Sequence, residues 1–127
     1  MELAVCDIQS TAAMSDESVH SRIQQIKQEM GDKLLILGHH YQRDSIVAHA
    51  DLLGDSFLLA KMASESKAKN IVFCGVHFMA ESADILTSDS QIVSLPNLRA
   101  GCSMADMANL EQVMDCWDEL IDELDLI

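Results

Sequence analysis

The sequence predicts an α/β domain of three layers (αβα), with helices on both faces of a short parallel sheet. Two observations predict this class. Short apolar runs, typical of parallel strands buried on both faces, occur at LLIL (34–37), IVFCG (71–75) and QIVSLP (91–96). Segments with helical signals separate these runs, and such alternation implies right-handed crossovers. Because no repeat, low-complexity tract or linker interrupts the chain, we expect a single domain over residues 1–127.

The first helix is predicted over residues 17–30, where apolar residues recur at spacings of three and four, and it ends at Gly31. Its apolar positions are Val19, Ile23, Ile26 and Met30. After the first strand, we expect a short helix that Asp44 caps and that runs to about Ala50. Gly54 then separates it from the next helix.

Three further helices are predicted downstream. DSFLLAKMASES (55–66) forms a helix that Asp55 or Ser56 can cap, and HFMAESADILT (77–87) forms another after the second strand. After NLRAGCSMAD (97–106), the chain enters an acidic amphipathic helix. The apolar positions of this last helix are Leu110, Val113, Met114, Trp117, Leu120, Ile121 and Leu124.

The charge is strongly negative and uneven. The formal net charge is -13, and residues 100–127 hold eight acidic residues and no basic one. Such a field repels phosphodiester backbones and anionic lipids, which argues against nucleic-acid and membrane partners. No apolar run reaches the length of a membrane span, and the first residues lack the basic start of a secretory signal. We therefore expect a soluble, cytoplasmic protein.

The four cysteines, Cys6, Cys74, Cys102 and Cys116, form no C-x-x-C pair, which argues against a zinc knuckle or a thioredoxin-type motif. In a reducing cytosol, disulfides are not expected. Most of these thiols are interpreted as small core residues.

The strand ends carry the candidate chemistry, because ligands of open parallel sheets gather at the carboxyl ends of the strands. GHHYQ (38–42) places His39, His40 and Tyr41 directly after the first strand. Imidazole carries protons near neutral pH, and a phenol can polarise a carbonyl. The alternative is that these side chains merely cap the strand. A zinc site at His39, His40 and His49 lacks a ligand-like spacing, and no dinucleotide or P-loop motif is present.

Three other residues have both a structural and a functional interpretation. Ser56 lies at a predicted helix start, where it either caps the helix or helps to bind a carboxylate or phosphate. His77 is interpreted as a structural residue that enters a helix. Cys102 follows Gly101 and leads into a predicted helix, whose dipole would stabilise the thiolate needed for a nucleophile or an iron ligand. A single thiolate cannot hold an iron-sulfur cluster, so further cysteines would have to come from outside this chain.

Four stretches together resemble quinolinate synthase, the iron-sulfur enzyme family of de novo NAD biosynthesis. They are LLILGHHYQ (34–42), ADLLGDSFLLA (50–60), IVFCGVHFMAESADIL (71–86) and SLPNLRAGCSMADM (94–107). They occur in family order and at family-like spacing, and GVHFMAE followed by AGCSMAD is the specific pair.

The resemblance implies a fold of three similar α/β domains, of which this chain matches the first. Each domain supplies one cysteine to a [4Fe-4S] cluster whose fourth iron is open to substrate, and Cys102 matches the ligand of the first domain. His39 and Tyr41 match substrate-contacting, catalytic residues, and Ser56 matches a substrate-binding serine. The implied reaction condenses iminoaspartate with dihydroxyacetone phosphate to quinolinate. Because the other domains are missing, the isolated chain is expected to be inactive and to self-associate through uncovered apolar surface.

Two alternatives stay open at this point. The first is a non-catalytic α/β module that binds a small anionic ligand or a protein partner at its strand ends. The second is a thiol-dependent hydrolase that uses Cys102 with His39 or His77, because such partners meet only in the folded chain.

Overall fold

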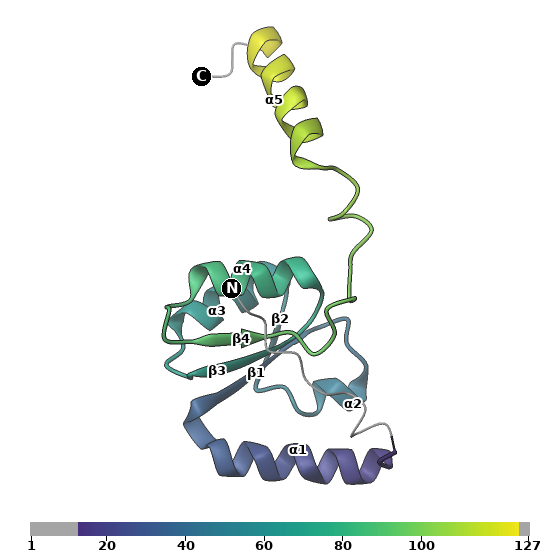
Figure 1. The fold of residues 1–127 in the computed structure, drawn as a ribbon, viewed down its shortest axis with the longest axis vertical. Helices are drawn as coiled ribbons and strands as arrows, with labels where there is room; N and C mark the ends of the chain where they lie inside the picture. The colour runs from purple at the N-terminus through teal and green to yellow at the C-terminus, as the bar shows by residue number, and fades with distance from the viewer. Residues whose placement is uncertain (1–12, 125–127) are drawn as a thin grey trace.

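The computed structural model describes residues 13–124, with side chains through residue 121. Its four strands form one sheet, in which every pair of neighbours runs parallel. The strands are β1 (Leu34–His39), β2 (Leu52–Gly54), β3 (Asn70–Cys74) and β4 (Ile92–Ser94), and their spatial order is β2-β1-β3-β4 (Figure 1). The three predicted strands are confirmed as β1, β3 and β4.

Strand β2 was not predicted, because three residues are too few to show a strand period. It pairs with β1 in the register Gly38 opposite Leu53. Gly38 makes this close approach possible: a Cβ there would lie 2.9 Å from both Ala50 Cβ and Leu53 Cδ2. The glycine of GHHYQ therefore has a packing role beside the candidate site.

Helix α1 (Asp16–Met30) begins and ends close to where the sequence predicts. The hydroxyl of Ser15 accepts the backbone N–H of Ser18 at 3.3 Å, which satisfies one free donor of the first turn. Gly31 ends the helix at φ 51°, a left-handed conformation that glycine adopts without steric cost. A single 3-10 turn, η2 (Gly31–Lys33), then leads into β1.

The remaining helices are α2 (Asp44–Val47), α3 (Ser56–Glu65), α4 (His77–Leu86) and α5 (Leu110–Leu124). Two expectations about α2 need correction. Asp44 does not cap α2, because Arg43 holds the N-cap position and Asp44 lies in the first turn. The helix is also shorter than predicted, since its backbone turns towards β2 before Ala50.

The chain folds into the predicted three layers. Helices α3 and α4 cover one face of the sheet, and α1 lies across the other (Figure 1). The apolar core fills the α3/α4 side, where alternate strand residues meet small residues of the helices. Its fully buried side chains include Leu37, Leu59, Ala63, Ile71, Phe73 and Ala83.

The α1 side is held by a polar network, here called the clasp and formed by His20, Lys27, His49 and Asp51. The Lys27 ammonium donates to the His49 carbonyl oxygen at 2.7 Å and lies 2.7 Å from the Asp51 carboxylate. Asp51 in turn accepts the backbone N–H of Ile36 at 2.8 Å, which links α1 to β1. His49 Nε2 lies 2.6 Å from His20 Nδ1.

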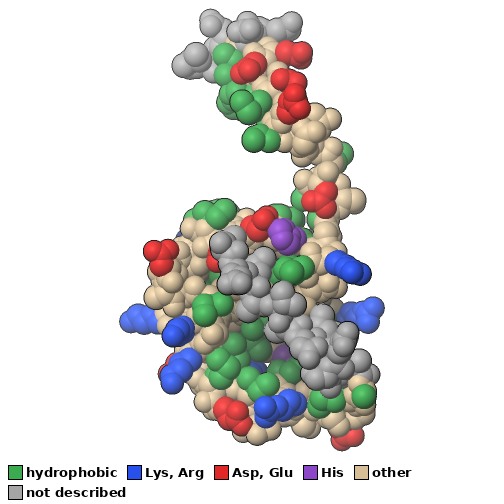
Figure 2. Space-filling view, in the orientation of Figure 1, with side chains coloured by type: hydrophobic (Ala, Val, Ile, Leu, Met, Phe, Trp, Pro, Cys, Tyr) green, Lys and Arg blue, Asp and Glu red, His purple; other side chains and the backbone are tan. Residues whose placement is uncertain are grey.

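Helix α5 projects away from the sheet and its covering helices (Figure 1). Its apolar side chains are exposed, including Trp117, which is 61% exposed. Figure 2 shows acidic and apolar side chains on different sides of this helix. Among the helices that the structure describes, none is long and apolar enough to cross a membrane.

Candidate functional site

The candidate site lies along the edge of the sheet where all four parallel strands end. Neighbouring strands are about 4.8 Å apart, so the edge from β2 to β4 spans roughly 15 Å. The chain leaves this edge four times: after His39, the last residue of β1, into Asp55 after β2, towards His77 after β3, and through the loop 95–102 after β4. The predicted site residues therefore start from one edge, as the parallel topology requires.

His39 is the buried member of the edge, with 4% of its side chain exposed. The backbone N–H of Tyr41 donates to His39 Nδ1 at 3.3 Å, so the neutral ring carries its proton on Nε2. Burial lowers the pKa of His39, and the charge of His40 adds to this, while Asp55 opposes it. A neutral imidazole that presents an N–H is suited to donate a hydrogen bond to a ligand oxygen.

The rings of His39, His40 and Tyr41 form one aromatic cluster. His39 stacks on His40 with centroids 4.3 Å apart, and the Tyr41 ring lies 4.6 Å from His39 and 4.4 Å from His40. The backbone N–H and Nδ1–H of His40 both donate to the Gly54 carbonyl oxygen, at 3.2 and 3.1 Å. Tyr41 is 82% exposed, so its phenol is accessible to a ligand at this edge.

Asp55, not Ser56, caps helix α3. The Asp55 carboxylate accepts the backbone N–H of Leu58 at 2.9 Å. The side chain of Ser56 is thus not used as the cap, and Ser56 lines a groove of about 370 Å³ between α3 and α4, together with Phe78 and Ser82. Ser56 directly follows Asp55, whose charge raises the pKa of His39 against the effect of burial.

The expectation that Cys102 lies at the entrance of a helix is wrong. Residues 103–107 form a turn, and α5 begins only at Leu110, so the helix-dipole argument for the Cys102 thiolate does not hold. The turn is closed by Asp106, whose carboxylate accepts the Cys102 backbone N–H at 3.2 Å and whose own N–H donates to the Cys102 carbonyl at 2.9 Å. The lack of a side chain on Gly101 leaves room for this carboxylate.

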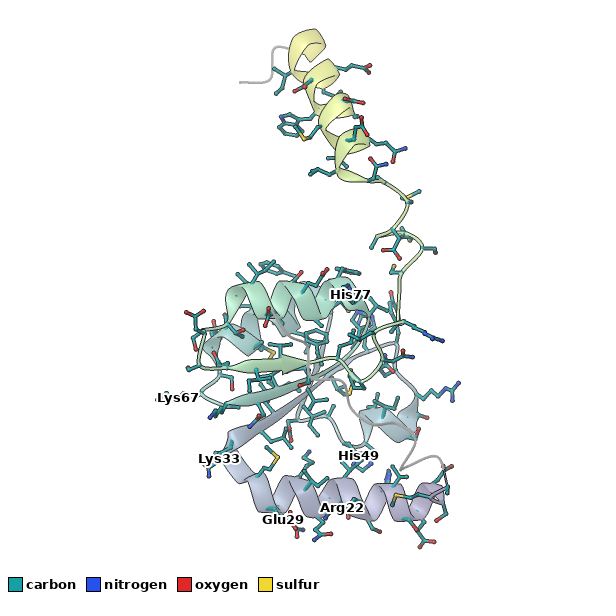
Figure 3. All side chains as sticks on the ribbon, in the orientation of Figure 1. Arg22, Glu29, Lys33, His49, Lys67 and His77 are labelled. Carbon is teal, nitrogen blue, oxygen red and sulfur yellow. The ribbon has the colours of Figure 1, made fainter. Side chains whose placement is uncertain are left out.

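The loop that carries Cys102 is tied to the start of α4. The His77 backbone N–H donates to the Ala100 carbonyl oxygen at 2.8 Å. The His77 ring, which is labelled in Figure 3, lies 3.4 Å from the Glu81 carboxylate. Cys102 is a half-buried free thiol, and among the hydrogen bonds of the described residues none joins it to an imidazole. The pairing that a thiol hydrolase needs is therefore not formed.

The other thiols lie elsewhere. Cys74 belongs to β3, and burial raises its pKa, as expected for a core thiol. Cys116 is exposed on α5, and Cys6 lies outside the described residues. Across the part of the chain that the structure describes, no group of three or more His, Cys, Asp or Glu side chains is arranged to hold a metal ion.

Sequence reasoning missed two residues that shape the edge. Asp106 was counted only among the acidic residues, although an acid four positions after Cys102 can close a turn on its backbone. Asp55 was considered only as a cap, yet its charge also acts on His39. The spacing of Asp106 was a readable signal, whereas the effect of Asp55 depends on the unpredicted strand β2.

Comparison with known proteins decides the family. Residues 21–126 match the family model described as quinolinate synthetase A protein. Proteins named quinolinate synthase from Corynebacterium glutamicum and Streptomyces coelicolor are each 60% identical over 107 residues, which is 84% of this chain. One from Bacillus cereus is 59% identical over 109 residues, or 85% of this chain.

The chain belongs to the quinolinate synthetase A family. It spans only 27% of the Corynebacterium and Streptomyces relatives and 30% of the Bacillus relative. The family match includes every strand, the His39–Tyr41 cluster and the Cys102 loop. The candidate site therefore lies entirely within the segment that the chain shares with its longer relatives.

Proposed function

We propose that this chain forms one α/β part of a quinolinate synthase active site, in the enzyme that condenses iminoaspartate with dihydroxyacetone phosphate during de novo NAD biosynthesis. The observation that carries the proposal is the 60% identity to proteins named quinolinate synthase. The three strand-end segments that resemble the family all lie within the matched residues 21–126.

Cys102 is the residue that would hold the family's [4Fe-4S] cluster. The donor set fits one corner of such a cluster, because Cys102 is a half-buried free thiol in the loop that follows β4 at this edge. At least two further cysteines must come from outside the chain. When bound, a cluster with an open iron supplies Lewis-acid chemistry at a substrate oxygen.

His39 and Tyr41 are the proposed catalytic residues. The lowered pKa of His39 keeps its ring neutral near pH 7, so Nε2–H can donate to a carbonyl or hydroxyl oxygen of the substrate. Tyr41 contacts the same ring and offers an accessible phenol as a second proton carrier. His40 fixes the segment to Gly54 and is assigned no chemistry.

Ser56 is the proposed ligand for a substrate carboxylate. Asp55 takes the capping position, so the Ser56 hydroxyl is not needed to cap α3. The first backbone N–H groups of this ten-residue helix add donors for an anion beside it.

The isolated chain should lack activity, because most of the length of its relatives is absent. We assign it to the cytoplasm, and its acidic character argues against nucleic-acid and membrane partners.

The role of His39 is tested by His39→Ala in a complete enzyme that contains this segment. We expect kcat to fall by about 10²- to 10⁴-fold, the usual contribution of a positioned proton carrier. His20→Ala is the matched control, because this imidazole belongs to the clasp and not to the edge. Unchanged turnover of His39→Ala would remove His39 from the mechanism.

The role of Cys102 is tested by Cys102→Ser in the same complete enzyme, after anaerobic reconstitution with iron and sulfide. We expect loss of the visible cluster absorption and a lower iron content. Cys116→Ser is the control, since this exposed thiol lies on α5. A normal cluster in Cys102→Ser would contradict the assignment, whatever the activity.

A further inference from the structure

One residue, Asp106, holds Cys102 from both sides. The Asp106 carboxylate accepts the Cys102 backbone N–H at 3.2 Å, and the Asp106 N–H donates to the Cys102 carbonyl oxygen at 2.9 Å. These two bonds restrain the peptide groups on either side of the Cys102 α-carbon. They therefore restrain the direction of its Cα–Cβ bond, so the sulfur keeps only the staggered positions of one rotation.

The chain that leads into this turn is itself restrained by hydrogen bonds. Four consecutive backbone N–H groups, those of residues 99–102, each donate a hydrogen bond. The first three are accepted by Asn97 or Arg99, and the last is accepted by Asp106. The Ala100 carbonyl oxygen also bonds this loop to the start of α4. Cys102 thus reaches the edge on a backbone whose position is determined before any metal is bound.

The glycine before the cysteine has a steric role in the same turn. The φ of Gly101 lies outside the left-handed region, so its backbone conformation does not require glycine. A Cβ at this position would lie 3.1 Å from Asp106 Oδ2, the atom that accepts the Cys102 N–H. Because this distance is shorter than ordinary van der Waals contact, a side chain here would displace the carboxylate. The absence of a side chain on Gly101 therefore serves the bond between Asp106 and Cys102.

We propose that Asp106 is the positioning residue for Cys102 as a cluster ligand, and that it acts through the place of its acceptor oxygen and not through its charge. This inference rests on the proposed function, in which Cys102 holds one iron of a [4Fe-4S] cluster. A ligand that is already held in place binds more tightly, because less of the chain has to be ordered when the metal binds. The charge does not help, since a carboxylate repels a thiolate and an anionic cluster.

Two variants of Asp106 test the proposal in a complete enzyme that contains this segment, after anaerobic reconstitution with iron and sulfide. Asp106→Asn keeps an acceptor oxygen at the same place without the charge, and Asp106→Ala removes both. The measurement is the rate at which an iron chelator removes the cluster, followed by visible absorption and iron content. We expect Asp106→Ala to lose its cluster at least about tenfold faster than the parent, the usual effect of removing a group that orients a metal ligand.

Asp106→Asn should lose its cluster at about the parent rate. Asp115→Ala is the matched control, because it removes an exposed carboxylate on α5 and should also leave the rate unchanged. A parent-like rate in Asp106→Ala would overturn the proposal. Equal losses in Asp106→Asn and Asp106→Ala would overturn it too, because the charge would then be the property that matters.

Gly101→Ala checks the steric part of the argument. In the parent background it should speed the loss of the cluster several-fold, because the new Cβ displaces the carboxylate. In the Asp106→Ala background the same change should have almost no effect, since no carboxylate is left to displace. Additive effects of the two substitutions would show that Gly101 and Asp106 act separately, which contradicts the proposal.

The turn can also be measured without a cluster, in the 127-residue chain. A bonded N–H must open before it exchanges with solvent, so the Cys102 amide hydrogen should exchange about tenfold faster in Asp106→Ala than in the parent. In Asp106→Asn it should exchange at about the parent rate. Far-UV circular dichroism and urea unfolding of the same samples show whether the fold is kept. An unchanged exchange rate in a folded Asp106→Ala chain would mean that Asp106 does not hold Cys102.

Failure of this inference and failure of the proposed function give different results. If Cys102→Ser keeps a normal cluster, Cys102 is not a ligand and both proposals fall. If Cys102→Ser loses the cluster while Asp106→Ala holds it as the parent does, Cys102 remains the ligand and only the role of Asp106 is refuted.

Discussion

The face of the sheet under α3 and α4 and the face under α1 are built from neighbouring residues of the same strands, yet different interactions hold them. On the α3/α4 face, Phe73 and Leu37 are fully buried against small helix residues. On the α1 face, Val72 is only half-buried and lines an apolar groove of about 480 Å³. Helix α1 contributes no buried residue and is joined to the sheet through the clasp.

This difference shows which face of the sheet contributes most to the stability of the fold and which face is less closely packed. Close packing makes the α3/α4 face a rigid support for His39 at the end of β1 and for His77 at the start of α4. The α1 face depends on a few hydrogen bonds and is less closely packed, with an apolar groove between α1 and the sheet. The four predictions that follow test this contrast.

The largest effect is expected from Phe73→Ala. The change leaves a cavity among fully buried neighbours, so the free energy of unfolding should fall by about 4 kcal/mol. Val72→Ala, one residue away on the other face, should cost only about 1 kcal/mol. Urea unfolding followed by far-UV circular dichroism measures both. Equal losses would show that the two faces are packed alike.

Gly38→Ala probes a tight point on the α1 side. The new Cβ would lie 2.9 Å from both Ala50 and Leu53, so the β1–β2 pairing must shift. We expect a loss of about 2 kcal/mol in the free energy of unfolding, as for other overpacked sites. Gly31→Ala is a contrasting case, since no atom lies within 4 Å of its Cβ position and only the left-handed backbone opposes the change. If Gly38→Ala is neutral, β2 is not packed as described.

Lys27→Met should cost about 1 kcal/mol in the free energy of unfolding. The substitution keeps most of the aliphatic chain but removes the bonds to the His49 carbonyl and to Asp51. The estimate is small because about a third of each charged side chain is exposed to solvent. Lys61→Met, whose ion pair with Glu65 is 3.9 Å long and exposed, should change stability by less than about 0.5 kcal/mol. A larger cost for Lys61→Met would contradict the role given to the clasp.

Most of the strands and helices, and the position of the candidate site, could be predicted from the sequence. Apolar runs without alternation located β1, β3 and β4, and spacings of three and four located α1 and α5. The same reasoning placed His39, Tyr41 and Cys102 at strand ends, because parallel strands must end at a common edge. Gly31 was readable as a helix stop, since few other residues tolerate its backbone conformation.

What could not be predicted depends on contacts between distant residues. His20 and His49 are 29 positions apart, and neither residue shows by itself that the two rings meet. Strand β2 is three residues long and exists because β1 offers it an edge. The sequence predicts a helix start after Cys102, where the structure has a turn. The acceptor is the Asp106 carboxylate, and an acid at this position is compatible with a turn and with the first turn of a helix, so the sequence does not distinguish the two.

The smallest expected effect is a dependence of stability on pH that originates in the clasp. Burial lowers the pKa of His49 below its ordinary value, and the charges of His20 and Lys27 lower it further. The folded chain therefore binds fewer protons than the unfolded chain, so stability is full above about pH 6.5 and is lost as the pH falls towards the folded pKa. His39, whose pKa is also lowered, contributes with the same sign. The free energy of unfolding should thus decrease between about pH 7.5 and 5.5, and less steeply in His49→Gln than in the parent chain. His39→Gln should remove the part that comes from the α3/α4 side, so the two variants assign the titration to the two faces. If neither variant changes the slope, the pH dependence has its origin outside both histidines.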